Sequence, residues 1–391
     1  MWMYRGWCRQ WNCSLIRCSV QSLRSSSFVR LRLTHPPLAS FTPFGRSLRS
    51  MATTPTELVF HNPNIRLGFH ISKMPTLEET FERIKTTPLK SYQIYVSSGR
   101  TWQPPKVDVE DIVKARHTID RYHRYACVHG CLLYNMAGSC DHRADPDFQR
   151  KLSNVVTGLT GELDLAAGLG GGVVVHVGSC KDKEKGLFTV SRTVETVLEA
   201  NSKETKNISK RLGLPVEEFR RSRKVILENA AGEGTKLGSN LDEIATIIEG
   251  VKEDVRDQVK VCIDTAHIFG AGQYDMGNAE SVVEFFDDFD SKIGLDRLEL
   301  FHLNDSRVPW GSRKDRHENL AKGFIFGDRR EDELDGTEGL KVLIERAEEL
   351  RIPLVGEPPA KTAEGGKAPG GIWDYEVVKG LVKLEERFCC G

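Results

Sequence analysis

Short apolar runs alternate with longer amphipathic segments along the chain from residue 64 onward. The short runs are rich in Val, Ile, Leu and Phe, which is typical of strands that are buried on both faces. Eight such runs are predicted to be strands, and they cover 65–72, 91–98, 125–130, 172–179, 224–231, 259–268, 298–305 and 353–358. A helix is predicted after each strand, at 76–86, 109–123, 146–170, 191–205, 241–251, 281–293, 338–350 and 375–388.

The regular alternation of strands and helices predicts an α/β fold with one parallel sheet. Eight repeats favour a single closed (β/α)8 TIM barrel, and an open doubly wound sheet is the alternative. The polar stretch 203–222 is predicted to be an insertion between a helix and the next strand, on the face of the barrel away from any chemistry.

The N-terminal segment differs in composition from the rest of the chain. Residues 1–50 contain eight Arg, no Lys and no acidic residue, with Ser and apolar residues between them. This composition is typical of a transit peptide. We therefore expect 1–62 to be a disordered targeting segment and 63–391 to be the barrel, with a mitochondrial or nuclear location. Met51 could start a shorter, untargeted form, and an untargeted tail is the alternative for the whole segment.

Charge and hydropathy exclude some classes of function. Without the eight N-terminal Arg, 47 of the 55 basic residues remain against 55 acidic residues, a balance of −8. This balance argues against a generic basic DNA-binding domain, unless bound metal cations offset the acidic residues. No run approaches the ~18 apolar residues that a membrane helix needs. We expect a monomer that does not engage a membrane.

Potential metal ligands follow the predicted strands in a regular pattern. The last six strands each carry a His, Asp or Glu at or near the C-terminal end: His129, His176, Glu228, Asp264, His302 and Glu357. In a barrel these strand ends surround one mouth, where active sites are built. Three more candidates, His267, Asp315 and His317, come from the loops after the sixth and seventh strands.

Each of these residues alone is explained as a hydrogen-bonded core His or a helix cap. Together they would place four mutually repelling carboxylates at one mouth unless cations bind between them. Imidazole and carboxylate groups suit zinc, manganese or iron, so the pattern predicts a metal site with several ions. Two weaker signals are set aside. Gly168–Gly172 precedes a strand and is interpreted as a helix stop, while Cys127 and Cys131 are interpreted as core residues and not as thiolate ligands.

Four sequence blocks resemble the endonuclease IV family of apurinic/apyrimidinic (AP) endonucleases. They are VILENAAGEGTKLG (225–238), VCIDTAHIFGAGQYD (261–275), FHLNDSRVPWGSRKDRHENL (301–320) and HVGS (176–179). The resemblance implies a (β/α)8 barrel with three Zn²⁺ ions that acts on double-stranded DNA in base excision repair. The implied reaction is hydrolysis of the phosphodiester 5′ to an abasic site, which leaves a 3′-hydroxyl, together with trimming of blocked 3′ ends.

The resemblance also implies a role for each of the nine candidates. His129 and His176 would hold one zinc, and Glu228 would bridge it to a second zinc and orient the attacking water as the catalytic residue. Asp264, His302 and Glu357 would complete the second site. His267, Asp315 and His317 would form the third, and Mn²⁺ could replace zinc at one site.

Residues outside the ligand set are assigned more loosely. Arg100 and Trp102 match the DNA-probing loop of the family, and Leu132 stands where the family commonly inserts an aromatic residue, with Leu133 beside it. Arg100, Arg313 and Lys361 are expected to contact phosphates, and a solvated surface charge is the alternative for each.

Asn229, Ser179 and Asn304 are expected to support the ligands. Ala321 replaces a family glycine.

Two other functions remain open at this point. A metal-dependent sugar isomerase or epimerase could use a related barrel, although it would not need Asp315 and His317. A catalytically silent DNA-binding homologue is the other alternative, and the nine intact ligand positions speak against it.

Overall fold

A computed structural model describes residues 65–85, 87–97, 105–106, 108–138, 146–327, 329–330, 336–359, 374 and 377–378 of the 391-residue chain. The predicted targeting segment 1–62 and the predicted helix 375–388 fall outside the described residues, except for residues 377–378 of that helix. Among the described helices, none combines the length and the apolar character that crossing a membrane requires.

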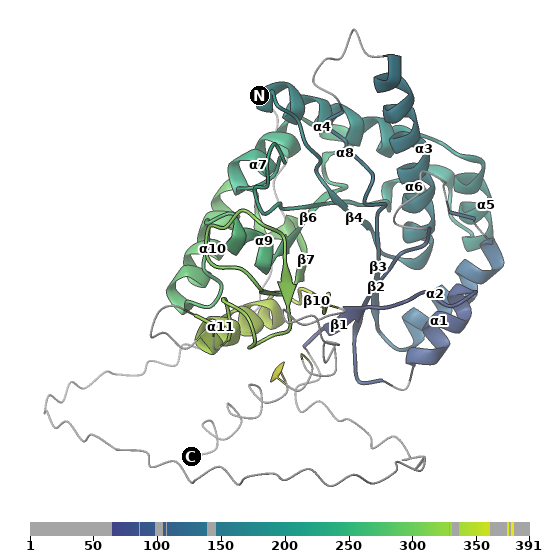
Figure 1. The fold of residues 1–391 in the computed structure, drawn as a ribbon. Helices are drawn as coiled ribbons and strands as arrows, with labels where there is room; N and C mark the ends of the chain where they lie inside the picture. The colour runs from purple at the N-terminus through teal and green to yellow at the C-terminus, as the bar shows by residue number, and fades with distance from the viewer. Residues whose placement is uncertain are drawn as a thin grey trace, which may run out of the picture. The chain divides into compact units, whose positions relative to one another are not determined.

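Eight parallel strands form a closed barrel, which confirms the predicted fold over the doubly wound alternative (Figure 1). Around the barrel the strands follow the order β1-β10-β7-β6-β5-β4-β3-β2. Their bounds are Leu67–His70 (β1), Ser91–Ile94 (β2), Tyr125–His129 (β3), Val173–His176 (β4), Val225–Glu228 (β5), Val259–Asp264 (β6), Leu298–His302 (β7) and Leu354–Gly356 (β10). Each of these strands lies within a predicted run.

Helices surround the strands (Figure 1). They are α1 (Leu77–Ile84), α2 (Val109–Arg121), α3 (Pro146–Leu169), α4 (Lys183–Glu199), α5 (Lys203–Leu212), α6 (Val216–Arg221), α7 (Leu241–Gly250), α8 (Glu253–Arg256), α9 (Thr265–Gly270), α10 (Ala279–Lys292), the 3-10 turn η1 (Leu295–Arg297) and α11 (Gly336–Glu349). A short antiparallel pair, β8 (Asp305–Ser306) and β9 (His317–Glu318), lies in the loop after β7.

The prediction of a helix at 191–205 was wrong at both ends. The helix α4 begins at Lys183, because the side chain of Asp182 accepts a hydrogen bond from the Lys185 N–H and caps it. It ends where Ala200 turns to an extended conformation.

The polar stretch 203–222 contains two helices, α5 and α6, which are joined through Gly213 in a left-handed conformation. Their amphipathic pattern places Ile208 and Phe219 in the core with no exposed surface. The many charged residues on their outer faces explain why no separate helix is predicted in this segment. The segment lies between α4 and β5 in the chain.

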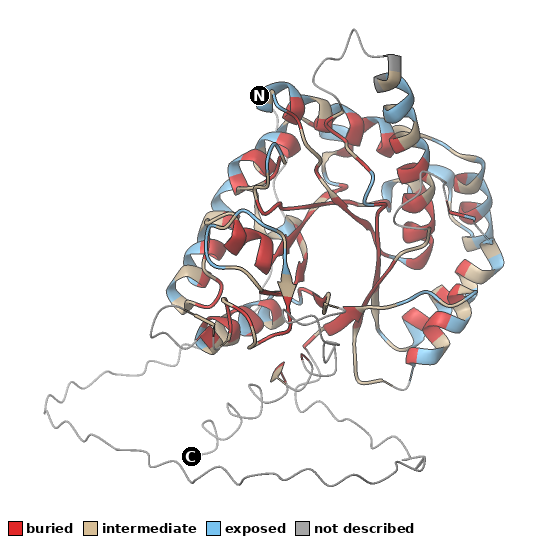
Figure 2. Cartoon of the chain, in the orientation of Figure 1, coloured by how far each residue is buried: buried red, intermediate tan, exposed pale blue. Residues whose placement is uncertain are grey.

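The barrel has two apolar layers. The larger core lies between strands and helices, and Figure 2 shows the strands mostly buried and the helices buried toward them. A smaller cluster has one residue from each of six strands: Cys127, Val174, Ile226, Cys262, Leu300 and Val355. Each lies two positions before one of the six strand-end candidates, and alternate strand residues share a face. This cluster therefore forms an apolar floor beneath the candidate ligands.

Candidate metal centre

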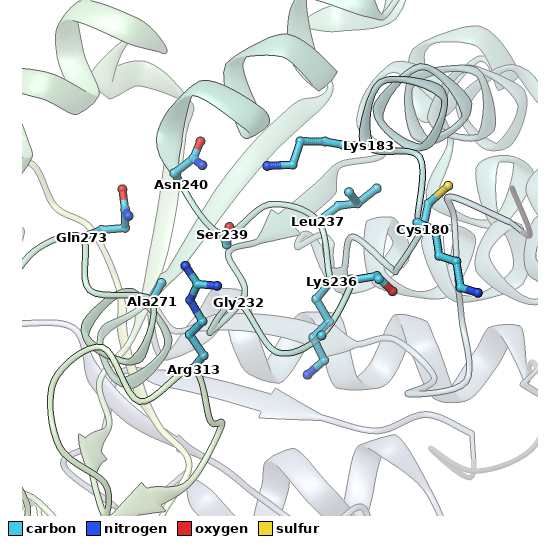
Figure 3. Close-up of a pocket in the computed structure, with 13 residues that line it drawn as sticks. Cys180, Lys183, Gly232, Lys236, Leu237, Ser239, Asn240, Ala271, Gln273 and Arg313 are labelled. Atoms are coloured by element: carbon cyan, nitrogen blue, oxygen red, sulfur yellow. The ribbon is translucent and has the colours of Figure 1, made fainter.

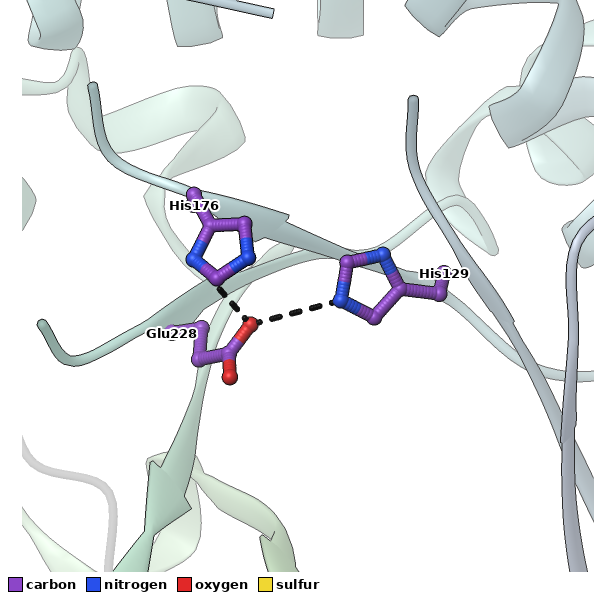
Figure 4. A group of neighbouring side chains, drawn as sticks. All are labelled: His129, His176 and Glu228. Carbon is purple, nitrogen blue, oxygen red and sulfur yellow. Dashed lines mark ion pairs between the residues drawn. The ribbon is translucent and has the colours of Figure 1, made fainter. Parts of the chain in front are cut away.

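The first group of candidate ligands contains His129, His176 and Glu228 (Figure 4). Strand register brings His176 and Glu228 side by side on β4 and β5. The Oε2 atom of Glu228 lies 3.5 Å from His129 Nε2 and 3.6 Å from His176 Nδ1. Ligand atoms that bind one tetrahedral zinc at about 2.1 Å are about 3.4 Å apart, so these spacings suit a shared ion.

The second group contains Glu228, Asp264, His302 and Glu357. Register again pairs neighbours, because Asp264 on β6 lies opposite His302 on β7. His302 Nδ1 lies 3.0 Å from Glu228 Oε1, 3.3 Å from Glu357 Oε2 and 3.8 Å from Asp264 Oδ2. Glu228 thus faces the first group with Oε2 and the second group with Oε1, as a bridging carboxylate would.

The third group contains Asp264, His267 and His317, with Asp315 beside them. Asp315 Oδ1 lies 3.2 Å from His267 Nε2 and 3.3 Å from His317 Nε2. Asp264 Oδ2 also lies 3.3 Å from His317 Nε2, so this carboxylate borders both the second and the third group. The structure therefore brings all nine predicted side chains together at the C-terminal ends of the strands.

The local fold orients these ligands. The predicted strand 259–268 ends at Asp264, whose Oδ1 caps α9 by accepting the N–H groups of Ala266 and His267 at 2.7 and 3.0 Å. The cap directs Oδ2 toward the centre and starts the helix that presents His267. His267 Nδ1 contacts the Asn229 carbonyl oxygen at 2.9 Å, which turns Nε2 toward the third group.

Asn229 and Asn304 support the ligands, as the sequence predicts. Asn229 Oδ1 accepts the Asp264 N–H at 2.6 Å. Asn304 Nδ2 donates to Asp264 Oδ2 at 2.7 Å, and its Oδ1 accepts the Glu357 N–H at 2.8 Å. Ser179 is placed differently, because its N–H donates to Asn135 Oδ1 in the loop after β3.

Two supporting residues, His70 and Gln93, were missed from the sequence. Gln93 Nε2 donates to Glu357 Oε1 at 2.8 Å, while its Oε1 lies 2.9 Å from His302 Nε2. His70 Nδ1 lies 3.0 Å from Gln93 Nε2. Both residues stand at or near the ends of β1 and β2. The search for His, Asp or Glu at strand ends, applied to all eight strands, would have found His70 but not Gln93, because glutamine is not among these residue types.

The imidazoles and carboxylates balance one another. Burial alone would raise the pKa of Glu228, but His176 and His302 hold that pKa well below its usual range. Burial opposes protonation of His267 and His317, yet the charges of Asp264 and Asp315 outweigh it and raise their pKa values to about 10 and about 9. The carboxylates therefore attract either protons on the imidazoles or cations between them.

Three buried ligand atoms show that the centre suits metal ions. Glu228 Oε2, His267 Nε2 and His317 Nε2 make no hydrogen bond to any described residue. A buried polar atom that makes no hydrogen bond costs roughly 1–3 kcal/mol. The chemistry of the donors, nitrogen from imidazole and oxygen from carboxylate, is that of zinc sites. Cys127 does not compete as a ligand, because it lies in the apolar floor and burial raises the pKa of its thiol.

The residues expected to contact DNA are only partly described. Leu132 and Leu133 are 47% and 39% exposed in the loop after β3, as insertion into a duplex would require. Arg313 is exposed two residues before Asp315. Arg100, Trp102 and Lys361 lie outside the described residues. Ala321 adopts a left-handed φ of 60°, a conformation that glycine adopts more readily than alanine.

Comparisons with known proteins agree with this geometry. Residues 81–329 match the family described as the xylose isomerase-like TIM barrel. Apurinic-apyrimidinic endonuclease 1 of Schizosaccharomyces pombe is 30% identical over 302 residues, which are 75% of this chain and 77% of the relative. Probable endonuclease 4 of Halothermothrix orenii is 32% identical over 264 residues, 67% of this chain and 85% of the relative.

Solved structures extend the agreement to the fold. Endonuclease IV from Thermus thermophilus superposes with a TM-score of 0.59 at 26% identity, covering 82% of this chain and 99% of that one. A D-tagatose 3-epimerase-like protein shares the fold at 16% identity, with a TM-score of 0.51 over 82% of this chain and 99% of that one. The chain belongs to the endonuclease IV family of AP endonucleases, within the xylose isomerase-like TIM barrels.

Proposed function

We propose that this protein is a zinc-dependent DNA repair endonuclease of base excision repair. It hydrolyses the phosphodiester 5′ to an abasic site in double-stranded DNA, leaves a 3′-hydroxyl and also removes blocking groups from 3′ ends. One observation carries the proposal: eight candidate ligands form three contiguous groups at the barrel mouth, joined by Glu228 and Asp264, and Asp315 lies beside the third group as the ninth. Relatives named as AP endonucleases and endonuclease 4 support the substrate.

Three metal ions per chain fit the three groups, with zinc at each and manganese as an alternative at one. Bound ions of this kind lower the pKa of water and offset charge that develops on a departing oxygen. The side chains of the protein contribute by holding the attacking water and the ligands in position. Glu228 lies between the first and second groups, where it would orient the attacking water, while Gln93 and Asn304 hold Glu357 from both sides.

DNA recognition is assigned to the loops around the mouth. Leu132 and Leu133 would enter the space that the missing base leaves in the stack, and their exposure supports this role. An abasic nucleotide has no base pair to break, so its extrusion toward the centre costs little. The protein would act as a monomer, because one chain supplies all nine candidate ligands.

Cleavage of a duplex that carries one abasic-site analogue tests the proposal. The full chain should nick the strand 5′ to the analogue, and Glu228→Gln should bind the duplex while its single-turnover rate falls by about 100-fold or more. Glu199→Gln is the matched control, because Glu199 is a half-buried carboxylate on α4 that pairs with Lys252 at 2.8 Å. It should nick like the unmodified protein.

A sugar epimerase is the competing activity. The structural likeness to an epimerase-like protein concerns the fold alone, and an epimerase would have no use for Asp315 and His317 in the third group. Turnover of ketose sugars by the metal-loaded chain, without any nicking of the abasic duplex, would reject the endonuclease proposal.

A further inference from the structure

Figure 3 shows a polar pocket of about 310 Å³ that is lined by Arg313, two residues before Asp315 of the third ligand group. Its walls come from the loops that follow β4, β5 and α9 and from Arg313 in the loop after β7. The pocket is tied to the metal centre through the backbone, because the Asp315 N–H donates to Glu233 Oε1 at 2.9 Å. The same β5 loop therefore shapes the pocket and holds a ligand of the third group.

The lining of the pocket is strongly basic. Four cationic side chains reach it: Lys181, Lys183, Lys236 and Arg313. Lys183 pairs with Glu243 at 2.7 Å and Lys236 pairs with Glu233 at 2.6 Å. Lys181 and Arg313 have no ion pair with any residue that the structure describes, so the pocket offers two uncompensated positive charges. This excess stands out in a chain whose residues after position 50 have a surplus of acids.

The backbone holds Arg313 in place. Its φ of 51° lies in the left-handed region that residues with a side chain rarely adopt. A hydrogen bond from the Arg313 N–H to the Gly270 carbonyl oxygen at 2.8 Å secures this conformation. The side chain then passes over Gly232, where an added Cβ would lie 3.7 Å from Arg313 Cγ, and points toward Ser239 in Figure 3. Strained backbone conformations of this kind cluster at functional sites.

We infer that this pocket binds a phosphate of the DNA backbone other than the one that is cleaved. The inference rests on the proposed function and adds a second anchoring point to it. A guanidinium can bind a phosphate through two parallel hydrogen bonds, and a lysine adds a point charge. Ser239 and Gln273 line the same space and can donate hydrogen bonds.

The pocket lies across the barrel mouth from the loops that are expected to probe the lesion. In the barrel order, β5 and β6 lie across the mouth from β1 and β2. The pocket is centred on the loops after β5 and α9, whereas the loops expected to probe the lesion follow β2 and β3. A duplex bound both at the pocket and at the lesion-probing loops would pass over the nine candidate ligands, which lie between these two places.

The salt dependence of DNA binding tests the inference. Binding would be measured in the Glu228→Gln background, with a duplex that carries an abasic analogue. Each lost phosphate contact lowers the slope of log affinity against log salt by about 0.9. Lys181→Ala with Arg313→Ala should therefore lower the slope by about 2 and weaken binding by at least about 10-fold at low salt. Ser239→Glu, which places a carboxylate beside Arg313, should weaken binding as well.

A matched control separates the pocket from net charge. Lys206→Ala removes an exposed lysine on α5, which is part of a connection into the N-terminal end of β5, and it should leave the slope unchanged. An unchanged slope in the double variant, or an equal loss in Lys206→Ala, overturns the inference. Inorganic phosphate that competes with DNA in the parent but not in the double variant supports it. Phosphate binding that the double variant abolishes without any effect on DNA affinity would assign the pocket to free phosphate and overturn it.

The two proposals fail in different ways. If the unmodified chain does not nick the abasic duplex, the proposed function is wrong. If it nicks the duplex and the double variant binds DNA like its parent, only the pocket is misassigned. Thermal unfolding of each variant at the same midpoint as its parent would show that the fold is retained.

Discussion

Glu228 offers its two carboxylate oxygens to two different groups of ligands, which makes it the residue on which the centre depends. Period-two alternation along a strand explains why this residue and its five strand-end counterparts could be found in the sequence. Each has an apolar residue two positions earlier that faces the same interior. Gln93 escaped because an amide does not titrate, although it contacts two of the ligands.

Gln93 should matter for metal affinity. Gln93→Leu would remove the hydrogen-bond partner that Gln93 gives to His302 Nε2 and to Glu357 Oε1. Loss of such a supporting contact typically weakens metal binding 10- to 100-fold, so we expect a loss of about that size. Titration with a chelator, followed by mass spectrometry of the retained metal, measures the change. Unaltered retention would show that the contacts of Gln93 do not orient the ligands.

Glu162 on α3 should make stability depend on pH. It is buried, accepts a hydrogen bond from Ser97 Oγ at 2.8 Å, and lies near His129 and Tyr134. Burial raises the pKa of this carboxyl from 4.5 to about 7, against the hydrogen bonds that lower it. The folded state therefore binds the proton more tightly than the unfolded state, and this stabilisation is lost as pH rises from about 4.5 through about 7.

Glu162→Gln removes that dependence, because the amide is neutral at every pH. The two proteins should differ little near pH 5. Near pH 8 the Gln variant should be more stable by up to about 3 kcal/mol. Urea unfolding of both proteins across this range measures the difference, and a difference that does not vary with pH would contradict the expectation.

At the scale of elements, strands were predicted better than helices. Dense apolar runs mark all eight strands, because a strand of a closed parallel barrel is buried on both faces. The start of α4 depends on one capping side chain, Asp182, and this local signal is weaker than periodicity. The helices α5 and α6 are not recognisable from the pattern of apolar residues, because most of their side chains are charged and only a few reach the core.

The connection that carries α5 and α6 should depend on a buried ion pair. Arg223 and Asp164 are both fully buried, with Arg223 Nη2 2.5 Å from Asp164 Oδ1. Asp164 also accepts hydrogen bonds from Ser202 Oγ and Thr205 Oγ1. Arg223→Met would leave a buried carboxylate without its counter-charge, which typically costs about 3–5 kcal/mol.

The double variant Arg223→Met with Asp164→Leu should recover much of the lost stability, because both charges are then absent. Chemical unfolding of the single and double variants measures the two changes. A single variant as stable as the unmodified protein would show that the ion pair does not fasten the connection to α3.

At the scale of the whole molecule, the N-terminal segment carries a separate proposal. We propose that residues 1–50 direct import into mitochondria and that a form starting at Met51 lacks this address, leaving it available to the nucleus. Their Arg-rich, acid-free composition supports this. A fluorescent reporter fused to residues 1–50 should enter mitochondria in cells. A reporter that stays diffuse in the cytosol would remove the assignment.

The acid surplus of the remaining chain has its counterpart at the barrel mouth, where four carboxylates meet five imidazoles. The sequence predicts this cluster of candidate ligands, because a closed barrel brings the C-terminal ends of all its strands to one place. The pocket beside the third group could not be predicted from the sequence, because its shape depends on how four separate loops pack and on the left-handed backbone of Arg313.

Metal content is the most direct test of the centre. The purified full chain, dialysed against metal-free buffer, would be analysed by inductively coupled plasma mass spectrometry with protein concentration from amino-acid analysis. The three ligand groups predict close to three ions per chain, mostly zinc, and His317→Ala should lower the content by one ion. One ion or none per chain in the unmodified protein would contradict the three-metal centre.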